Sequence, residues 1–427
     1  MQRFRWAVTV VVMLVWAGLV LSVASCDHAP PPFKCTDTLG CVTLEPHEAI
    51  KIGVIQALSG HVAPLGTEQV RGTELAIDKR QGMLLGHPIS VQIEDTGCTA
   101  EGGANSALKL IADPQTVAIV GTTCSGAAAT ASQAMSNAGL TMISGNNSAP
   151  FLTAIGGKRA PNWQAGYFRT APNEENAGKT AALFAFEKLG VRKAATINDG
   201  DIYTRGLTDG FKQKFQSLGG EIVLSTGITK GEKEMAPVLT AVLNSGAQLL
   251  FFPLFQPEGN YVVLQARKMA GFEHITLMSD GSLIESSFIE AVGDSGKGMY
   301  FVGPYFPKGN AVDDLNKAYR LKYNATPSAD YYLSAYDATN LLLNAIEKVA
   351  VRSPDGSLHI GHQALRDALY AVKDFKGVSG TLTCNEFGDC GEPAFNILRL
   401  DHPKQGVNGL LSNIQFTYHL NNELSRR

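Results

Sequence analysis

The sequence lacks the short motifs that identify the common enzyme classes. Its 427 residues contain no G-x-S-x-G, H-E-x-x-H or Walker A pattern, which mark serine hydrolases, zinc proteases and nucleotide hydrolases. No C-x-x-C pair is present, and no histidine stands at ligand spacing beside a cysteine. These absences predict a protein that is not an enzyme and has no catalytic residues, no cofactor and no bound metal.

A strong excess of charge is also missing. Lysine and arginine number 36 against 39 aspartates and glutamates, and the formal net charge is −3 with no basic patch. Because nucleic-acid binding depends on clustered positive charge, we expect no nucleic-acid partner. Beyond the N-terminus, no apolar run reaches the roughly 20 residues of a membrane-spanning helix. We therefore expect a soluble body.

The first 26 residues have the order of an export signal. Arg3 and Arg5 precede an uncharged apolar run over residues 7–21, and Val23-Ala24-Ser25-Cys26 follows. This order predicts a signal peptide over residues 1–25, with an uncleaved N-terminal anchor as the alternative. The last four residues also resemble the lipobox of bacterial lipoproteins, in which the cysteine carries the lipid.

The lipobox resemblance implies a lipid on Cys26 and a lipid-anchored tether over residues 26–48. Ala29-Pro30-Pro31-Pro32 favours an extended chain there, because proline disrupts helices. We therefore expect an extracytoplasmic protein that is lipid-anchored to the outer face of the cell membrane or periplasmic.

Six of the seven cysteines remain if Cys26 carries lipid, and this even number suits three disulfides in an exported protein. Two pairs are close in sequence, and the third consists of the cysteines that are left. A metal site is the weaker alternative. The expected disulfides are Cys35–Cys41, Cys384–Cys390 and Cys98–Cys124.

Strands and helices alternate along the chain from Ile50. The first series predicts strands at 50–55, 90–94, 117–120 and 140–143, with helices at 67–79, around 104–111 and at 126–137. The second series predicts strands at 193–197, 221–224, 249–252 and 275–278, with helices at 174–189, around 207–215, at 235–244 and at 260–269. A third stretch, over 313–349, has strong helical character.

This alternation predicts an α/β fold of two Rossmann-like lobes with parallel sheets, joined by hinge crossovers. The expected hinges are near Phe168, Tyr300 and Gly377. The expected lobes are 49–168 with 301–377, and 169–300 with 378–427.

Three loops after predicted strands are candidate binding elements, because ligands bind at the carboxyl ends of parallel strands. The first loop places Ser125 at a helix start, where backbone N–H groups favour an anion. The second loop offers Asn146, Asn147 and Ser148, and the third offers Asp280 for an ammonium group. Each loop also has an ordinary explanation as a helix cap or a polar turn.

A set of short motifs, spread in order over residues 50–395, resembles the type I periplasmic binding proteins of the leucine/isoleucine/valine-binding branch. The motifs are Ile52-Gly53-Val54, Leu58-Ser59-Gly60, Gly66, Arg71-Gly72, Asp95, Cys98, the 121–125 loop, Met142-Ile143-Ser144, Phe168-Arg169-Thr170, Tyr203, Asp280-Gly281, Gly298-Met299 and Gly388-Asp389.

The resemblance assigns roles to the candidate residues. Ser125 and Ser148 correspond to hydroxyl residues that hold the ligand carboxylate and backbone. Asn146 corresponds to a backbone carbonyl for the ammonium, and Tyr203 to an aromatic residue of the second lobe. Asp280 corresponds to the acidic partner of the ammonium, which is usually glutamate in leucine binders.

The expected side-chain pocket departs from the leucine-binding pattern. Leu65 stands where an aromatic residue is common, and Phe255 and Gln256 stand where tyrosines often occur. Gln256 offers a donor to a polar ligand or simply faces solvent. The preferred side chain therefore cannot be read from the sequence.

Together these features predict a monomeric binding protein. It captures a free amino acid, branched-chain or related, and delivers it to the permease and ATPase subunits of an ABC importer. The alternatives are a sensor domain of the same fold, or a binder of amides, urea or aromatic acids.

Overall fold

The computed structural model describes residues 33–419, and its large compact unit begins at Cys35. The expected signal peptide over 1–25, the lipidated Cys26 and most of the proline-containing tether lie outside the described residues, as do residues 420–427. Between residues 33 and 419, no helix has both the length and the apolar character needed to cross a membrane.

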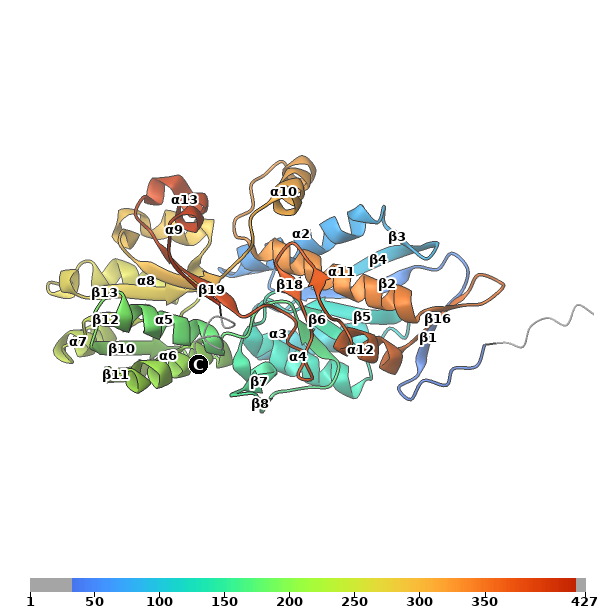
Figure 1. Ribbon diagram of the computed structural model, residues 1–427, viewed down its shortest axis with the longest axis horizontal. Helices are drawn as coiled ribbons and strands as arrows, with labels where there is room; N and C mark the ends of the chain where they lie inside the picture. Colours follow the sequence, from blue (N-terminus) through green and yellow to red (C-terminus); the bar gives the residue numbers. More distant parts are fainter. Residues whose placement is uncertain (1–32, 420–427) are drawn as a thin grey trace, which may run out of the picture. The chain divides into compact units, whose positions relative to one another are not determined.

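Six strands form the first sheet, in the order β3-β4-β2-β5-β6-β9 (Figure 1). All neighbours are parallel except β3, which is antiparallel to β4. The predicted parallel sheet is therefore confirmed. The strands are β2 (Ile50–Gln56), β3 (Met83–Leu84), β4 (His87–Asp95), β5 (Thr116–Gly121), β6 (Met142–Ser144) and β9 (Tyr167–Arg169).

Alternating side chains give the first sheet a core on each face, because successive residues of a strand point in opposite directions. Ile119 and Met142 pack with residues of α3 and α4 on one face. Val120 and Ile143 pack with residues of α2, α11 and α12 on the other face. The helices are α2 (Ala63–Lys79), α3 (Ala100–Ile111), α4 (Ser125–Asn137), α11 (Tyr331–Val349) and α12 (His362–Tyr370).

Seven strands form the second sheet, in the order β11-β10-β12-β13-β14-β19-β20. The strands from β11 to β14 are parallel, as expected, but β19 and β20 join by antiparallel pairing that the sequence analysis did not anticipate. The strands are β10 (Lys193–Asn198), β11 (Glu221–Gly227), β12 (Leu249–Phe251), β13 (Thr276–Asp280), β14 (Tyr300–Pro304), β19 (Ala394–Arg399) and β20 (Ile414–His419).

The second sheet is also covered on both faces. Leu249 and Phe251 pack with residues of α5 and α6, while Leu250 packs with residues of the remaining helices on the opposite face. The helices are α5 (Glu175–Glu187), α6 (Ile202–Ser217), α7 (Ala236–Asn244), α8 (Glu258–Ala266), α9 (Ser286–Val292) and α13 (Gly406–Ser412).

The chain passes three times between the two lobes. The first crossing follows β9 at residues 170–174, and the second follows β14 at residues 305–309, because β14 still pairs within the second sheet. Leu382, Cys384 and Cys390 pack in the core of the first lobe, so the third crossing follows Cys390. The last two crossings therefore lie beyond the expected hinges near Tyr300 and Gly377.

The predicted helical stretch over 313–349 is two helices, α10 (Asn310–Tyr323) and α11. Asn324 ends α10 with a positive φ of 49°, and Pro327 follows in the connection. Asparagine tolerates this left-handed conformation and proline interrupts helices, so the break has a local cause. Leu315 and Tyr319 of α10 pack against α2 and α11 in the first lobe.

Small elements complete the described chain, and the sequence analysis did not predict them. They are β1 (Cys41–Leu44), β15 (Val351–Arg352) and β16 (Leu358–Gly361) in one sheet, the hairpins β7 (Ala154–Ile155) with β8 (Lys158–Arg159) and β17 (Phe375–Lys376) with β18 (Thr381–Leu382), and the 3-10 turns η1 (Pro150–Leu152), η2 (Phe272–His274), η3 (Gly281–Leu283), η4 (Gly293–Gly296) and η5 (Pro403–Gln405).

The three disulfides pair as expected: Cys35–Cys41, Cys98–Cys124 and Cys384–Cys390. Cys98–Cys124 connects the loop before α3 to the residue that precedes α4. It therefore fixes the backbone beside Ser125.

Candidate ligand site

The candidate site is a cavity of about 10 Å³ between the carboxyl ends of the two sheets. Six of the nine predicted ligand-binding residues meet here, from both lobes. The lining residues are Leu65, Thr123, Ser125, Asn146, Ser148, Tyr203, Phe255, Ser282 and Tyr331. The volume is about the room that one water molecule needs, so the lobes are closed and must separate for a ligand to enter.

Ser125 is the first residue of α4 and is almost fully buried. Cys124 precedes the helix, so Ser125 is not its N-cap residue, and its hydroxyl instead accepts a hydrogen bond from the backbone N–H of Ala149 at 3.3 Å. The hydroxyl proton and the positive end of the α4 dipole remain available to an anion. This arrangement suits the carboxylate of a ligand.

The second loop wraps around a buried serine. The Ser144 hydroxyl accepts hydrogen bonds from the backbone N–H groups of Asn146 and Asn147, at 3.1 and 2.9 Å. The Asn146 amide donates to the carbonyl of Thr123 at 3.2 Å and so connects this loop to the first. As a result, Asn146 and Ser148 are held at the cavity wall.

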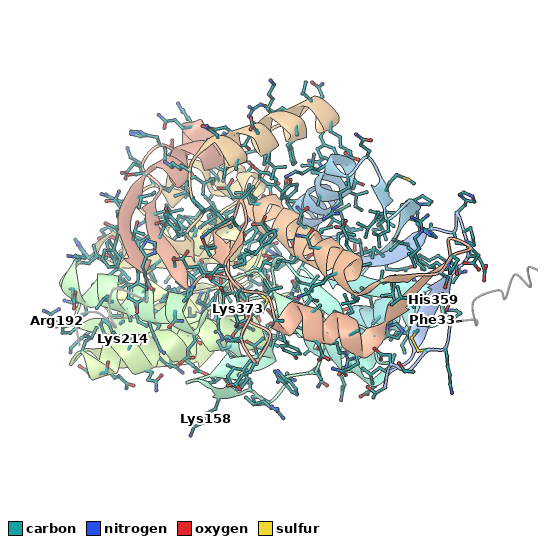
Figure 2. All side chains as sticks on the ribbon, turned by 45° about the vertical axis from the view of Figure 1, so that its right-hand side comes forward. Phe33, Lys158, Arg192, Lys214, His359 and Lys373 are labelled. Carbon is teal, nitrogen blue, oxygen red and sulfur yellow. A yellow bond between two sulfur atoms is a disulfide. The ribbon has the colours of Figure 1, made fainter. Side chains whose placement is uncertain are left out.

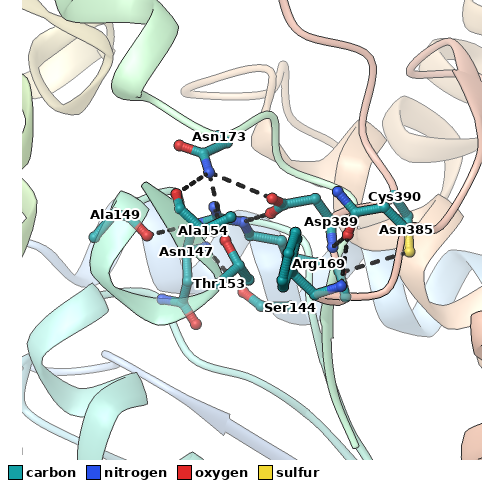
Figure 3. Close-up of polar contacts among 12 residues, drawn as sticks. Ser144, Asn147, Ala149, Thr153, Ala154, Arg169, Asn173, Asn385, Asp389 and Cys390 are labelled. Carbon is teal, nitrogen blue, oxygen red and sulfur yellow. Dashed lines mark hydrogen bonds and ion pairs between the residues drawn. The ribbon is translucent and has the colours of Figure 1, made fainter. Parts of the chain in front are cut away.

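Arg169 holds the second loop in place through hydrogen bonds to residues 147–153 (Figure 3). Its guanidinium donates to the carbonyls of Asn147 and Ala149 at 3.3 and 2.7 Å, to the Thr153 hydroxyl at 2.5 Å and to Asp389 at 2.6 Å. The side chain of Arg169 is fully buried. Because these acceptors engage all three guanidinium nitrogens, Arg169 is a positioning residue rather than a ligand-binding cation.

Tyr203 and Asp280 form one unit in the second lobe. The Tyr203 hydroxyl donates to the Asp280 carboxylate, which also accepts from the backbone N–H of Ser282 at 3.1 Å and from the Ser282 hydroxyl at 3.0 Å. The Tyr203 ring packs on Phe255 with centroids 5.1 Å apart. Burial raises the pKa of Asp280 to about 6, while these donors oppose the shift.

Three predicted residues do not line the cavity. Asp280 is fully buried behind Tyr203 and Ser282. The Asn147 amide is used by Thr122, whose backbone N–H donates to its oxygen at 2.9 Å. Gln256 donates to Glu285 and accepts from Asn260. The side-chain amides of Asn147 and Gln256 therefore have internal hydrogen-bond partners, and their contact with a ligand stays a prediction.

Four residues at the site were missed by the sequence reasoning. Thr123, Ser282 and Tyr331 line the first cavity, and Glu174 lines a neighbouring cavity, also of about 10 Å³. Thr123 and Ser282 stand beside predicted residues in the candidate loops and were within reach of the same argument. Glu174 stands in the first interlobe crossing and Tyr331 begins α11, and no local pattern indicates that either residue reaches the site.

Contacts between the lobes confirm that the cleft is closed. The Lys230 ammonium donates to the carbonyl of Cys98 at 3.2 Å, and the backbone N–H of Ser286 donates to the carbonyl of Ser328 at 3.1 Å. A Cβ atom at Gly126 would lie 2.6 Å from a carboxylate oxygen of Asp201. The small residue at position 126 therefore permits the close approach of α4 and α6.

A larger cavity of about 530 Å³ lies on the other side of Tyr331, between α10, β14 and α13. None of the predicted ligand-binding residues lines it. The small cavity, where hydroxyls from both lobes converge on one point, is the better candidate for specific binding.

The site is acidic. Within residues 33–419, no lysine, arginine or histidine lines either small cavity. Basic side chains such as Lys158 and Arg192 lie at the outer edges of the molecule (Figure 2). A ligand with a positive group therefore meets the carboxyl group of Glu174, while a lone anion meets only hydroxyls and backbone N–H groups.

Comparisons with known proteins agree with this geometry. Residues 49–392 match the family model described as periplasmic binding protein. The chain is 27% identical over 358 residues to Leu/Ile/Val-binding protein homolog 3 of Brucella melitensis, covering 83% of this chain and 92% of that protein. It is 27% identical over 349 residues to the leucine-, isoleucine-, valine-, threonine- and alanine-binding protein of Pseudomonas aeruginosa, covering 80% and 87%.

Solved structures share the fold. A leucine-binding protein of Thermotoga maritima superposes with a TM-score of 0.75 at 20% identity, covering 88% of this chain and 100% of that one. A solute-binding protein of R. palustris, solved in complex with benzoate, gives a TM-score of 0.70 at 22% identity, covering 82% and 93%. The shared architecture is the two-lobed type I fold. It occurs both in a protein named for binding leucine and in one solved with benzoate.

Proposed function

The chain belongs to the periplasmic binding protein family, and from this premise we propose that it captures an α-amino acid and delivers it to an ABC importer. Proteins of this family are extracytoplasmic solute-binding proteins rather than enzymes. One observation supports the amino-acid ligand most. The Ser125 and Ser148 hydroxyls share one cavity with Tyr203, which is hydrogen-bonded to Asp280.

The charges of the site favour a zwitterion over an aromatic acid. The ligand carboxylate accepts a hydrogen bond from the Ser125 hydroxyl and lies at the N-terminus of α4. Charge-assisted hydrogen bonds of this kind are strong. The ammonium faces the acidic side, where Asp280 lies behind Tyr203. An aromatic acid has no amine to place on that side, so it gains only the hydrogen bonds to its carboxylate.

The curated relatives support the same ligand class. One is named for binding leucine, isoleucine and valine, and another also for threonine and alanine. The apolar wall of Leu65 and Phe255 in this chain suits a small or branched aliphatic side chain. The proposed ligand is therefore a neutral aliphatic amino acid, bound directly by Ser125, Ser148, Asn146 and Tyr203.

Attachment and assembly are part of the proposal. The lipobox-like sequence that ends at Cys26 supports a lipid anchor, with residues 26–48 as the tether and the permease and ATPase subunits as partners. We propose that the protein acts as a monomer, with one ligand between the lobes. Mass spectrometry of membrane-extracted protein tests the anchor: a mature N-terminus at Cys26 with a lipid-sized mass increase is expected, and an unmodified Cys26 contradicts it.

Binding of aromatic acids is the second candidate, because structural neighbours hold benzoate and hydroxybenzoates. Isothermal titration of the exported chain separates the two. Leucine, isoleucine, valine, threonine and alanine are titrated in parallel with benzoate and 4-hydroxybenzoate. Saturable heat from at least one amino acid and none from the aromatic acids is expected. The reverse pattern replaces the amino-acid proposal, and no heat from any compound contradicts both.

A further inference from the structure

Glu174 lies at the site although the proposed function has not used it. It is the last residue of the first crossing and directly precedes α5. Its backbone N–H donates to the carbonyl of Ser148 at 3.0 Å, and its side chain is only 4% exposed. The chain therefore fixes Glu174 against one of the two serines that the proposal assigns to the ligand.

The Glu174 carboxyl has an unused acceptor. Within the described residues, its Oε2 atom has no hydrogen-bond partner. The residue lines the second small cavity together with Asn146, Ser148 and Tyr331, and these three side chains also line the first cavity. A buried carboxyl oxygen without a partner is unfavourable, so a ligand group that donates a hydrogen bond would stabilise it.

Asp280, in contrast, has hydrogen-bond donors on both carboxylate oxygens. Its Oδ2 atom accepts from the Tyr203 hydroxyl and the Ser282 backbone N–H, and its Oδ1 atom accepts from the hydroxyls of Ser282 and Ser279. All these donors belong to the protein, and Asp280 does not reach the cavity surface. An ammonium group carries three N–H donors, and Glu174 offers the acceptor that Asp280 lacks.

We propose that Glu174 is a second carboxyl group of the ligand site, which binds the ligand ammonium directly while Asp280 supports it through Tyr203. This inference rests on the proposed amino-acid function and makes it narrower. The site selects ligands with a protonated primary amine next to the carboxylate. It rejects acids of the same shape that lack the amine.

The groups around Glu174 raise its pKa, so ligand binding is coupled to loss of a proton from this carboxyl group. Burial and the nearby Asp280 carboxyl raise the pKa of Glu174 to about 8, whereas the Ser148 hydroxyl, the Arg169 guanidinium and the Tyr203 hydroxyl lower it. Tyr331, from α11, also faces the pair, and its own pKa is raised well above the usual value by burial and by Glu174 and Asp280. In the closed, ligand-free cleft, Glu174 therefore holds a proton at pH 7.

The balanced step follows from these charges. The protonated Glu174 carboxyl and the ligand ammonium become a carboxylate–ammonium pair, and the carboxyl proton leaves to solvent. Binding therefore releases up to one proton per ligand at pH 7. Affinity rises as the pH rises from 6 to 8, because less work is then needed to remove that proton.

The test is calorimetric and starts with the unmodified chain. Valine, leucine, threonine and alanine are titrated at pH 7 in phosphate and in Tris, whose ionisation enthalpies differ, so the difference in heat counts the protons released. The amine-free analogues 3-methylbutanoate and 4-methylpentanoate replace valine and leucine in a second series. We expect proton release of more than half per ligand, and at least 100-fold weaker binding of the amine-free acids.

Two variants test whether the proton release and the affinity depend on Glu174. Glu174→Gln is expected to bind about 10- to 100-fold more weakly, as for the loss of a hydrogen bond to a charged group, and to release no proton. Glu175→Gln is the matched control, since that neighbour bonds to Lys179 and to the backbone of Gly156, and it should behave as the unmodified chain. Thermal unfolding checks that both variants are folded.

The outcomes separate the two proposals. If an amino acid binds the unmodified chain without proton release, and Glu174→Gln binds equally well, the role of Glu174 is wrong while the proposed function stands. The same holds if an amine-free acid binds as tightly as its parent amino acid. If no amino acid binds at all, both proposals fall. The wild-type titrations decide even if Glu174→Gln does not fold.

Discussion

The Tyr331 hydroxyl occupies the space that a side chain at Gly281 would need. A Cβ atom added at Gly281 would overlap this oxygen, whereas the ring carbon that carries it would lie 3.7 Å away, an ordinary contact distance. Gly281 follows β13 in the second lobe, and Tyr331 begins α11 in the first lobe. Closure of the lobes over the ligand therefore depends on a glycine facing a tyrosine.

Gly281→Ala should weaken ligand binding without unfolding either lobe. The added methyl group obstructs closure, and overpacking of this kind costs about 1–3 kcal/mol, or roughly 5- to 150-fold in affinity. The double variant Gly281→Ala with Tyr331→Phe should recover most of the loss, because the clashing oxygen is gone. Isothermal titration of the three proteins measures this, and failure of the second change to rescue binding would disprove the contact.

Ser125→Ala should weaken binding by about 10- to 100-fold, since a hydrogen bond to a charged ligand group contributes roughly 1.5–3 kcal/mol. Ser132→Ala is the matched control. Ser132 is equally buried on α4 but does not line the cavity. Titration with the same amino acid compares both. Equal affinities for the two variants would mean that the carboxylate does not bind at the start of α4.

Arg169→Met should reduce the free energy of unfolding by about 3–5 kcal/mol, because it breaks a buried ion pair with Asp389 and leaves the acceptors of the 147–153 loop without their donor. Denaturant unfolding followed by circular dichroism measures this. The exposed Lys158→Met is the control, with an expected change below about 0.5 kcal/mol. Similar stability of the two variants contradicts the positioning role of Arg169.

The Cys98–Cys124 disulfide closes a loop with a sequence separation of 26 residues. Chain-entropy arguments give such a loop a stabilisation of about 3.5 kcal/mol, against about 2 kcal/mol for the six-residue separation of Cys35–Cys41. Alanine substitution of each pair, followed by thermal unfolding, should show the larger loss for the first. Loss of the Cys98–Cys124 disulfide should also weaken ligand binding, because Cys124 precedes Ser125. An unchanged affinity would show that this disulfide does not position Ser125 for the ligand.

Tyr203→Phe removes a donor that lowers the pKa of Asp280, now about 6. The pKa of Asp280 should therefore rise further, and the carboxylate should be lost at a higher pH as the solution is acidified. Affinity measured from pH 5 to pH 7 in a Glu174→Gln background isolates this group. The midpoint of the loss should move to higher pH in the Phe variant, and an unmoved midpoint shows that Asp280 does not control binding.

Much of the fold is predictable from local patterns. The alternation of apolar runs located the parallel strands except β9 and β14. The loops after the predicted strands located Ser125, Asn146 and Ser148 at one cavity, whereas Tyr203 was identified by the family resemblance. The antiparallel strands β19 and β20 could not be placed in this way. Their pairing depends on where the chain returns to the second lobe, after the core contacts of Leu382 and Cys390.

The acidic side of the site shows a second limit. The loop pattern identified Asp280 but not the four protein donors that engage its carboxylate. Glu174 stands in a crossing between lobes, beside the equally acidic Glu175, and only the fold separates the buried carboxyl from the partly exposed one. Burial and hydrogen-bond satisfaction are properties of the packed chain, so residue type and spacing do not reveal them.

The most direct test of the central claim is a crystal structure of the protein with the amino acid that binds best in titration. We expect the ligand between the lobes, with its carboxylate within about 3 Å of the Ser125 hydroxyl and its ammonium at similar distance from a Glu174 oxygen. A ligand bound in the larger cavity beyond Tyr331, or one with its carboxylate turned toward Glu174 and Asp280, would contradict the account.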